Sequence, residues 1–324
     1  MQPKHYPLLS KIAIKKRDQQ RPKLQHKIST GDSDMPLEKI NQARKLVGDI
    51  NRILNEHGIQ ANILPSDILI TDTKVTDGFK ENKKLSNAII DHLWPSIKYA
   101  DVYHFTQSDK AENIINNNIF RLNNIANRFN DGEIRTFCET HDLKGYLEID
   151  ESGEPAYKHL MANTFYASFT DTSLTEEREE YFWNNFSQCN GARLKFKISA
   201  INSDFRKIFY EADICKPIPL LFSLTTQIRE KYNREFILSG ISKLCAFYLS
   251  GKDYGVEAEY RVLYRNWGNS PGPEPIGNGK ESYFELPLNQ MTACGFKFEI
   301  IEVCANEKPN IPDAYTFLKR RMNP

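Results

Sequence analysis

Two acidic residues lie two positions apart late in the chain, Glu257 and Glu259, next to a strand-forming run that contains Arg261 and Arg265. In an extended segment both acidic side chains point to the same face. Two carboxylates on one face repel each other, which raises the pKa of at least one of them unless solvent or a cation intervenes. A carboxylate here can stabilise positive charge on a ribose carbon as a leaving group departs, as in glycoside cleavage. The alternative, favoured by the spacing alone, is a solvated strand edge on which Arg261 or Arg265 neutralises the acids.

A histidine and three aromatic residues earlier in the chain could bind a nucleotide. His104 can donate a hydrogen bond to a ribose hydroxyl or a phosphate oxygen. Tyr166 can stack on a flat cationic ring, and Tyr181 or Trp183 can cover its other face, each contact contributing roughly 0.5–2 kcal/mol. Each residue alone has a structural alternative, as a histidine satisfied by backbone carbonyls at a strand end or as part of an aromatic core. Their order along the chain is what favours a common site.

The elements that position these residues are a mixture of helices and short strands. Apolar spacings of three or four predict a helix that begins at Asp34-Met35-Pro36 and ends at Gly58, and the pattern predicts further helices over residues 85–93, 109–118 and 226–249. Strands are expected at residues 68–71, where the run looks buried, and at 102–106, 164–169, 192–198, 261–264, 282–288 and 295–304. Helices inserted among many short strands predict an α+β fold. Neither GxGxxG after a strand nor GxxxxGK[ST] occurs, so no Rossmann or P-loop nucleotide site is expected.

Composition excludes several classes of protein. The 324 residues include 43 Lys and Arg against 42 Asp and Glu, which argues against a nucleic-acid binder with a broadly basic surface. The six cysteines have no CxxC or Cys/His ligand spacing, so we expect neither a zinc site or other metal centre nor a disulfide scaffold. No apolar run approaches 18 residues, so we expect no membrane span.

The first 27 residues differ from the rest, with eight Lys or Arg and a single acid, Asp18. They contain no apolar h-region and no small-residue cleavage site, so a secretory signal peptide fits poorly. We therefore predict a basic, disordered tail over residues 1–33, a helical N-terminal region over 34–99 and a main domain over 100–324. The functional alternatives for the tail are electrostatic attraction to acidic surfaces and a recognition segment.

Four segments, taken in order, resemble the ADP-ribosyltransferases of the diphtheria-toxin-like, histidine-tyrosine-glutamate class. The run YHFTQSDKAENIINNNI resembles the opening strand and helix of that class, FYASFTD its tyrosine-bearing strand, EREEYFWNNF the aromatic helix that follows, and GVEAEYRVLY the late strand with the catalytic glutamate. The middle and late segments also resemble a widespread bacterial family of uncharacterised domains with an E-x-E-x-R motif. The resemblance covers roughly residues 100–304. It implies a core of two packed, mostly antiparallel sheets with flanking helices.

The resemblance also implies roles for individual residues, with NAD as co-substrate. Glu259 would be the catalytic acid, and Glu257 sits where relatives that modify arginine carry an acceptor-activating glutamate, which suits a guanidinium that must be positioned and deprotonated. Contacts to NAD would come from the histidine motif, the tyrosine strand and the aromatic helix: His104, Tyr103, Thr106, Tyr166, Ser168, Tyr181 and Trp183.

Two departures from the family pattern affect the NAD pocket. Phe105 replaces the small residue that follows the histidine in the toxins. The stretch between Asn123 and Asn163 is longer than a simple link between strands and is expected to be an insertion that covers the pocket. Its residues Arg128, Asn130 and Asp131 are therefore further candidates for contacts to NAD.

The resulting expectation is a mono-ADP-ribosyltransferase that modifies a protein side chain, with arginine as the favoured acceptor. The resemblance suggests a bacterial effector, made in the bacterial cytosol and delivered into a host cell without a signal peptide. A metabolic dehydrogenase, glutamate dehydrogenase, is a candidate target because one effector of the superfamily acts on it. The alternatives are an NAD glycohydrolase, a nucleic-acid-modifying toxin and a non-catalytic interaction domain.

Overall fold

The computed structural model describes residues 37–77, 83–128, 131–149, 151, 153–187, 191–201, 204–211, 216–238, 245–250, 254–266 and 274–306, and all structural statements concern these. The chain divides into two units, Met1–Ile40 and Asn41–Pro324. The expected helix start at Asp34-Met35-Pro36 and the basic tail lie outside the described residues. The domain boundaries given above stay predictions.

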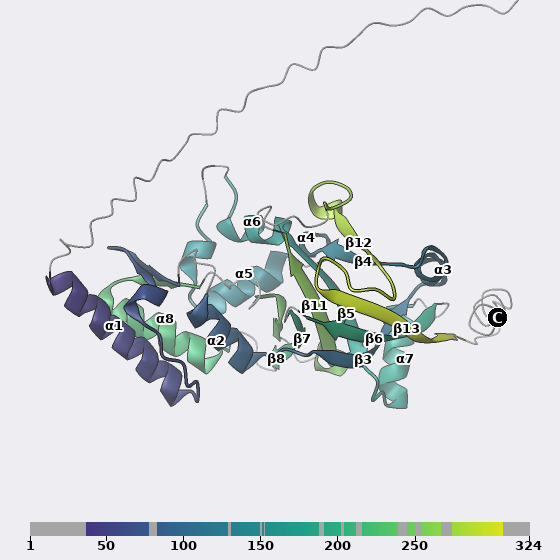
Figure 1. Cartoon of the computed structure of the whole chain (residues 1–324), viewed down its shortest axis with the longest axis horizontal. Helices are drawn as coiled ribbons and strands as arrows, with labels where there is room; N and C mark the ends of the chain where they lie inside the picture. Colours follow the sequence, from purple (N-terminus) through teal and green to yellow (C-terminus); the bar gives the residue numbers. More distant parts are fainter. Residues whose placement is uncertain are drawn as a thin grey trace, which may run out of the picture. The chain divides into compact units, whose positions relative to one another are not determined.

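The largest element is an eight-stranded sheet in which every strand pair is antiparallel (Figure 1). Six strands follow the order β12 (Tyr283–Pro287), β4 (Ile119–Asn124), β5 (Thr164–Asp171), β3 (Tyr99–Thr106), β6 (Ala192–Ala200) and β13 (Phe296–Ala305). Strand β11 (Glu259–Arg265) lies off this path, between β5 and β7 (Phe205–Lys207).

Strand β5 is the branch point of this sheet. Strand β11 pairs with β5 from Glu259 opposite Thr170 to Arg265 opposite Thr164. Of the strands on the main path, β4 pairs with the first part of β5, at Phe165 and Tyr166, and β3 pairs with its end, at Thr170 and Asp171. Strands β4 and β3 therefore leave β5 at different positions, with an aromatic cluster between them.

Alternation along β5 separates two faces of the sheet. Phe165 and Phe169 belong to one buried cluster, whereas Tyr166 belongs to another. The first cluster lies among the strands and includes Val102, Phe120, Phe165, Phe169, Phe196, Val262, Phe284 and Phe298. Because side chains alternate in a strand, Tyr166, Ser168 and Thr170 project from the opposite face.

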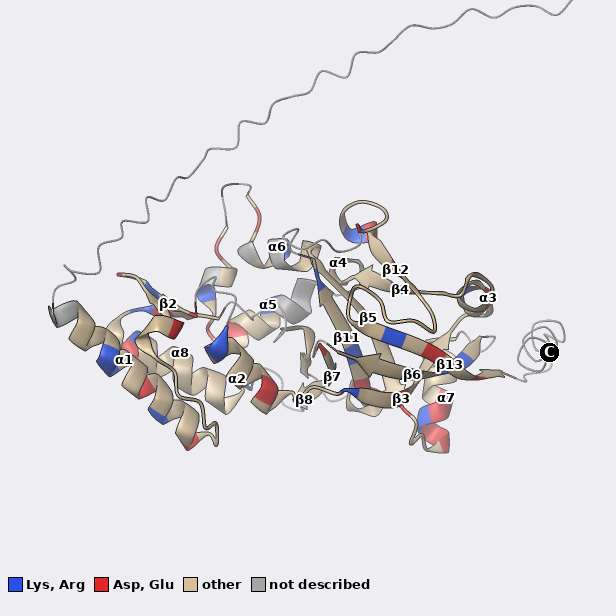
Figure 2. Ribbon diagram, viewed as in Figure 1, with Lys and Arg blue, Asp and Glu red and all other residues tan. Residues whose placement is uncertain are grey.

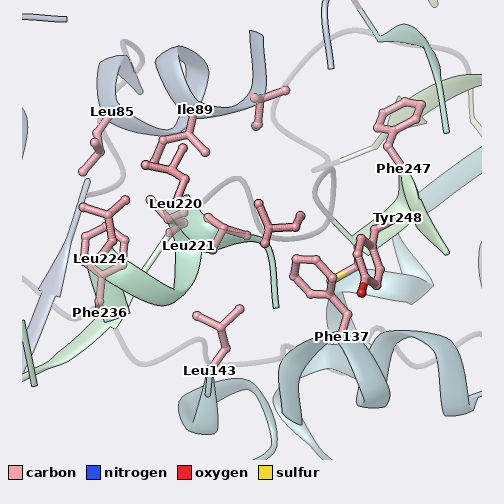
Figure 3. Packing of buried hydrophobic residues seen from close by; sticks show 14 of the residues in the cluster. Leu85, Ile89, Phe137, Leu143, Leu220, Leu221, Leu224, Phe236, Phe247 and Tyr248 are labelled. Carbon is pink, nitrogen blue, oxygen red and sulfur yellow. The ribbon is translucent and has the colours of Figure 1, made fainter. Parts of the chain in front are cut away.

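The second buried cluster joins helices from both halves of the chain. Helix α1 (Leu37–Glu56) contributes Leu46 and Ile50, α2 (Lys84–Leu93) contributes Leu85 and Ile89, and α8 (Pro219–Tyr232) contributes a leucine row. Figure 3 shows Leu220, Leu221 and Leu224 of α8 beside the side chains of α2 and beside Phe236. Residues of the region 34–99 thus share one core with residues after 200.

Small sheets and further helices complete the described fold. A three-stranded sheet is formed by β1 (Leu69–Ile70), β2 (Lys74–Thr76) and β9 (Glu235–Ile237), and β8 (Phe209–Glu211) pairs in parallel with β10 (Tyr248–Ser250). The helices are α3 (Ser108–Asn117), α4 (Ile125–Arg128), α5 (Asp131–Thr140), α6 (Ala156–Ala162) and α7 (Glu176–Asn185), with short 3₁₀ turns that include η1 (Pro65–Asp67), η2 (Lys144–Tyr146), η3 (Tyr254–Glu257) and η4 (Gly279–Glu281). No helix among the described residues is long and apolar enough to cross a membrane.

The α+β class is confirmed, whereas the bounds of one predicted helix and the burial of one predicted strand are wrong. The helix expected over residues 226–249 is α8, which starts at Pro219 and stops at Tyr232 because Asn233 adopts the left-handed conformation (φ 51°). Strand β9 and strand β10 occupy part of the remainder. The run at residues 68–71 forms the strand β1, but Leu69 is 48% exposed, so this strand is not buried.

Candidate active site

Glu259 and Arg261 form a buried ion pair on strand β11. The Arg261 Nε donates to Glu259 Oε1 at 2.6 Å and Nη2 donates to Oε2 at 3.0 Å, while the two side chains are only 5% and 7% exposed. The remaining terminal nitrogen of Arg261 donates to the Ala246 carbonyl oxygen at 2.5 Å. Neutralisation of the acid by Arg261 is therefore confirmed for Glu259. The strand is not a solvated edge, because β11 lies between β5 and β7.

Glu257 lies outside the strand, at the end of the 3₁₀ turn η3. The residue between the two acids, Ala258, has φ 40°, which interrupts the extended conformation expected for both glutamates. That expectation is wrong for Glu257. Burial, and next the charge of Glu259, raise the pKa of the Glu257 carboxyl. The Tyr181 hydroxyl donates to Glu257 Oε1 at 3.0 Å and opposes this rise.

Helix α7 brings Tyr181 to Glu257 by its phase. Its N-cap, Thr175, accepts a hydrogen bond from the backbone N–H of Arg178. Acidic residues fill the first turn, where their negative charge interacts favourably with the positive end of the helix dipole (Figure 2). Arg178 and Tyr181 are three residues apart and so share one side of the helix. Arg178 donates to the Val256 carbonyl oxygen at 2.8 Å, which places this side against the turn that carries Glu257.

The other side of α7 packs on strand β3. The rings of Phe182 and Phe105 stack with centroids 5.0 Å apart, and the Trp183 ring meets Phe105 edge-on at 5.1 Å. The Trp183 Nε1 donates to Glu179 at 3.3 Å. Of the two residues proposed as the wall opposite Tyr166, the structure therefore brings Tyr181 to the carboxyl pair and turns Trp183 toward β3. Phe105, the residue that departs from the family pattern, anchors the helix.

Tyr166 and Ser168 share a face with the ion pair. The register sets Arg261 opposite Ser168 and Leu263 opposite Tyr166, so these side chains project to the same side. The Arg261 guanidinium lies over the Tyr166 ring, 5.2 Å from its centroid. Tyr166 is only 7% exposed. One face of this ring thus already holds a flat cation.

His104 lies on the opposite face of the sheet. Its ring packs against Phe120, Phe169 and Phe196 with centroids 5.3, 5.6 and 6.4 Å away, inside the aromatic cluster between the strands. Its Nδ1 lies 3.1 Å from the Ser168 carbonyl oxygen. The structure does not bring the histidine ring together with Tyr166 and the glutamates, and its contact to NAD stays a prediction.

The neighbours of His104 in the motif have different surroundings. Tyr103 projects to the face that bears Thr170, and the Arg193 guanidinium lies 4.4 Å from the centre of its ring. Thr106 is buried at the end of β3. A Cβ on Gly191 would come within 2.0 Å of the Thr106 carbonyl oxygen, so the close approach of these two backbone segments requires glycine at position 191.

The candidates in the region 123–163 are only partly placed. Arg128 ends α4 and Asp131 begins α5, and nothing is described of their side chains; Asn130 lies outside the described residues. Several described apolar residues of this region, among them Phe137, Cys138 and Leu143, belong to the second buried cluster, whereas Ile149 is 64% exposed. Coverage of the pocket by this region stays a prediction.

Two site residues escaped sequence reasoning. Arg178 donates to the Val256 carbonyl oxygen in the turn before Glu259 and to the Ser173 carbonyl oxygen before α7, and the Tyr210 hydroxyl accepts the Glu259 backbone N–H at 2.8 Å. Burial, and next the charge of Glu259, raise the pKa of Tyr210. The spacing of Arg178 and Tyr181 on one helix face was visible in the sequence, but nothing in the sequence places Tyr210 beside β11.

Neither metal-binding groups nor similarity to known proteins assigns a function to this chain. Among the described residues no group of three or more His, Cys, Asp or Glu could hold a metal ion. Comparison with protein-family models, with curated proteins and with solved structures finds no match for this chain. Any function must therefore be argued from the residues and their geometry.

Proposed function

We propose that the protein is a mono-ADP-ribosyltransferase that transfers ADP-ribose from NAD to a protein side chain, with arginine as the favoured acceptor. The observation that carries this proposal is the pairing of two carboxyl groups in unlike environments. Glu259 is held by a bidentate cation, whereas Glu257 is held by a hydroxyl and has a raised pKa. Such a difference between neighbouring carboxyls is typical of sites that divide charge stabilisation from proton transfer.

The proposed reaction assigns one task to each carboxyl. The acceptor guanidinium nitrogen forms a bond to the ribose carbon, the bond from that carbon to nicotinamide breaks, and nicotinamide leaves. Glu259 offsets the positive charge on the ribose as this bond breaks. Glu257 takes the proton that the guanidinium loses, and a raised pKa makes its carboxylate a better base near neutral pH.

Aromatic residues next to these carboxyls support binding of the nicotinamide ring. The contact of Arg261 with Tyr166 demonstrates that a flat cation fits against this tyrosine, but it also occupies that face. Tyr181 is half-buried and hydrogen-bonded to Glu257. We therefore assign the stacking ring to Tyr181 first and to Tyr166 second.

The fold class proposed for the sheet agrees with this function. Strand β4 pairs with one end of β5 and continues to β12, and strand β3 pairs with the other end and continues to β6 and β13. Aromatic residues of these two groups of strands pack together. We infer that these groups correspond to the two packed sheets of an ADP-ribosyltransferase core. A bacterial effector role and glutamate dehydrogenase as target stay predictions of the sequence resemblance.

The test is incubation of the full chain with NAD labelled in its adenylate, together with an arginine-containing peptide or a cell lysate. We expect labelled protein and free nicotinamide in equal amounts. Glu259→Gln should abolish both, while Glu257→Gln should abolish labelling and leave slow nicotinamide release. Lys158→Gln is a surface control, since the Lys158 ammonium pairs with Glu154 at 2.6 Å and the two side chains are 40% and 50% exposed.

Other outcomes would overturn parts of the proposal. Nicotinamide release without labelled protein would identify an NAD glycohydrolase, in which water replaces the acceptor. Label in DNA or RNA would identify a nucleic-acid-modifying enzyme. If NAD is neither cleaved nor bound in calorimetry, the chain is an interaction domain and the proposal fails.

A further inference from the structure

The turn that carries both candidate carboxyls is strained. Ala258 lies between Glu257 and Glu259 with φ 40°, in the left-handed region that residues with a side chain rarely adopt. Such a conformation costs on the order of 1–3 kcal/mol and persists only where the surroundings enforce it. The cause should therefore be visible in contacts to the backbone of the turn.

Three side chains from separate elements hold that backbone. Arg178 of α7 donates from Nε to the Val256 carbonyl oxygen at 2.8 Å and from Nη2 to the Glu257 carbonyl oxygen at 3.4 Å. Thr170 of β5 donates to the same Glu257 oxygen at 2.7 Å and accepts from Arg178 Nη2 at 3.2 Å. On the far side of Ala258, the Tyr210 hydroxyl of β8 accepts the Glu259 N–H.

Arg178 is itself fixed in place. Its Nη1 donates to the Ser173 carbonyl oxygen at 3.0 Å and approaches Asp171 Oδ1 at 3.4 Å, and its side chain is only 18% exposed. A planar guanidinium can bind several carbonyl oxygens at once in a fixed geometry, which a lysine ammonium cannot reproduce. The same helix carries Tyr181, whose hydroxyl binds the carboxyl of Glu257.

We propose that Arg178 is a positioning residue that holds the turn Val256–Glu259 and thereby fixes the Glu257 carboxyl between Tyr181 and Glu259. This inference rests on the proposed transferase activity for its consequence, but not for its geometry. Arg178 binds the backbone of Glu257, and Tyr181 binds its side chain. Both the path of the turn and the direction of the Glu257 carboxyl therefore depend on one face of helix α7. Without Arg178, Ala258 relaxes and Glu257 turns toward solvent.

The test compares Arg178→Ala, Arg178→Lys and Thr170→Val with the control Arg135→Ala. Arg135 lies on α5 and pairs with Glu139 on the same helix, with its side chain 65% exposed. We expect Arg178→Ala to lower the rate of transfer at least tenfold with the KM for NAD changed less than threefold. Arg178→Lys should not restore the rate, Thr170→Val should have a smaller effect, and Arg135→Ala should have none.

Two measurements report on the conformation of the turn and do not depend on enzymatic activity. Hydrogen exchange of the Glu259 amide, which binds Tyr210, should become at least tenfold faster in Arg178→Ala, while exchange in β5 stays slow. The pKa of Glu257, followed by NMR of labelled carboxyl carbons, should fall toward its ordinary value, since burial is what raises it most.

The outcomes separate this inference from the proposed function. If Arg178→Ala shows faster exchange and a lowered Glu257 pKa while the wild-type chain does not consume NAD, the role of Arg178 is supported and the transferase is rejected. Unchanged exchange and titration in Arg178→Lys and Thr170→Val would overturn the role of Arg178, whatever the activity. General loss of protection across β5 would also overturn it, because Arg178 would then support the whole fold and not this turn.

Discussion

Loss of either member of the Glu259–Arg261 pair should destabilise the protein strongly. Both side chains are nearly inaccessible, and the two Arg261 nitrogens meet both oxygens of Glu259. Removing one partner of such a pair leaves a buried charge without compensation and costs about 3–5 kcal/mol. Arg261→Met also leaves the Ala246 carbonyl oxygen without this donor, which costs about 1–3 kcal/mol more.

The double variant Glu259→Leu/Arg261→Met should be more stable than either single variant. It contains no unpaired charge, so its main cost is the lost donor to Ala246, about 1–3 kcal/mol. Urea denaturation of the four proteins at pH 7 gives the coupling energy from the midpoints, provided that the slopes agree. If the costs of the single variants simply add, within about 0.5 kcal/mol, the two residues are not coupled as described.

This cycle also makes the catalytic test of Glu259 interpretable. A single Glu259 variant can lose activity because it unfolds or because the carboxylate is absent. The double variant retains the fold and still lacks the carboxylate. Its inactivity would show that the loss of activity does not come from unfolding, and wild-type turnover in it would remove Glu259 from the reaction.

Four further changes test the site and its supports. A raised pKa of the Glu257 carboxyl gives the wild type stability that is present at low pH and lost as pH rises through the folded-state pKa. Glu257→Gln lacks this dependence, so urea denaturation should show it becoming more stable relative to wild type as pH rises from 4 to 7. Tyr181→Phe removes a hydrogen bond to the charged form of Glu257, so carboxyl NMR should detect a still higher pKa. Gly191→Ala should lower the thermal midpoint, because its methyl group collides with the backbone of Thr106. Phe182→Ala should cost about 3–5 kcal/mol in urea denaturation and loosen α7 in hydrogen exchange.

Periodicity was sufficient to predict most of the elements, and its failures have physical causes. The apolar repeats of α1 and α2 give helices that end close to the expected positions: α1 ends at Glu56, two residues before Gly58 with φ 82°, and α2 ends at Leu93, before Pro95. The apolar run after α8 misled the prediction because short buried strands and helix segments have the same composition. Only the left-handed Asn233 marks the end of that helix, and asparagine is a weaker stop signal than glycine.

The candidate site was predictable in its residue types but not in its geometry. Spacing identified Glu257 and Glu259, yet alternation along a strand fails where Ala258 turns into the left-handed region. The face on which His104 lies depends on the branching of the sheet around β5, which joins strands far apart in sequence. A motif read along the chain cannot supply that information, since a one-residue change of register exchanges the two faces of a strand.

The arrangement of charges is harder to explain as a stabilising feature than as a functional one. An ion pair between Glu259 and Arg261 would be complete without a second carboxyl next to it. The second carboxyl, Glu257, is held close enough for Glu259 to raise its pKa, and the turn between them is strained. Both features cost stability, and three hydrogen bonds from Arg178 and Thr170 to the carbonyl oxygens of Val256 and Glu257 maintain them. A fold that needed only a neutral core at this position could have used an apolar residue at 257, so the location of this strain and charge is the strongest structural argument that the site performs chemistry.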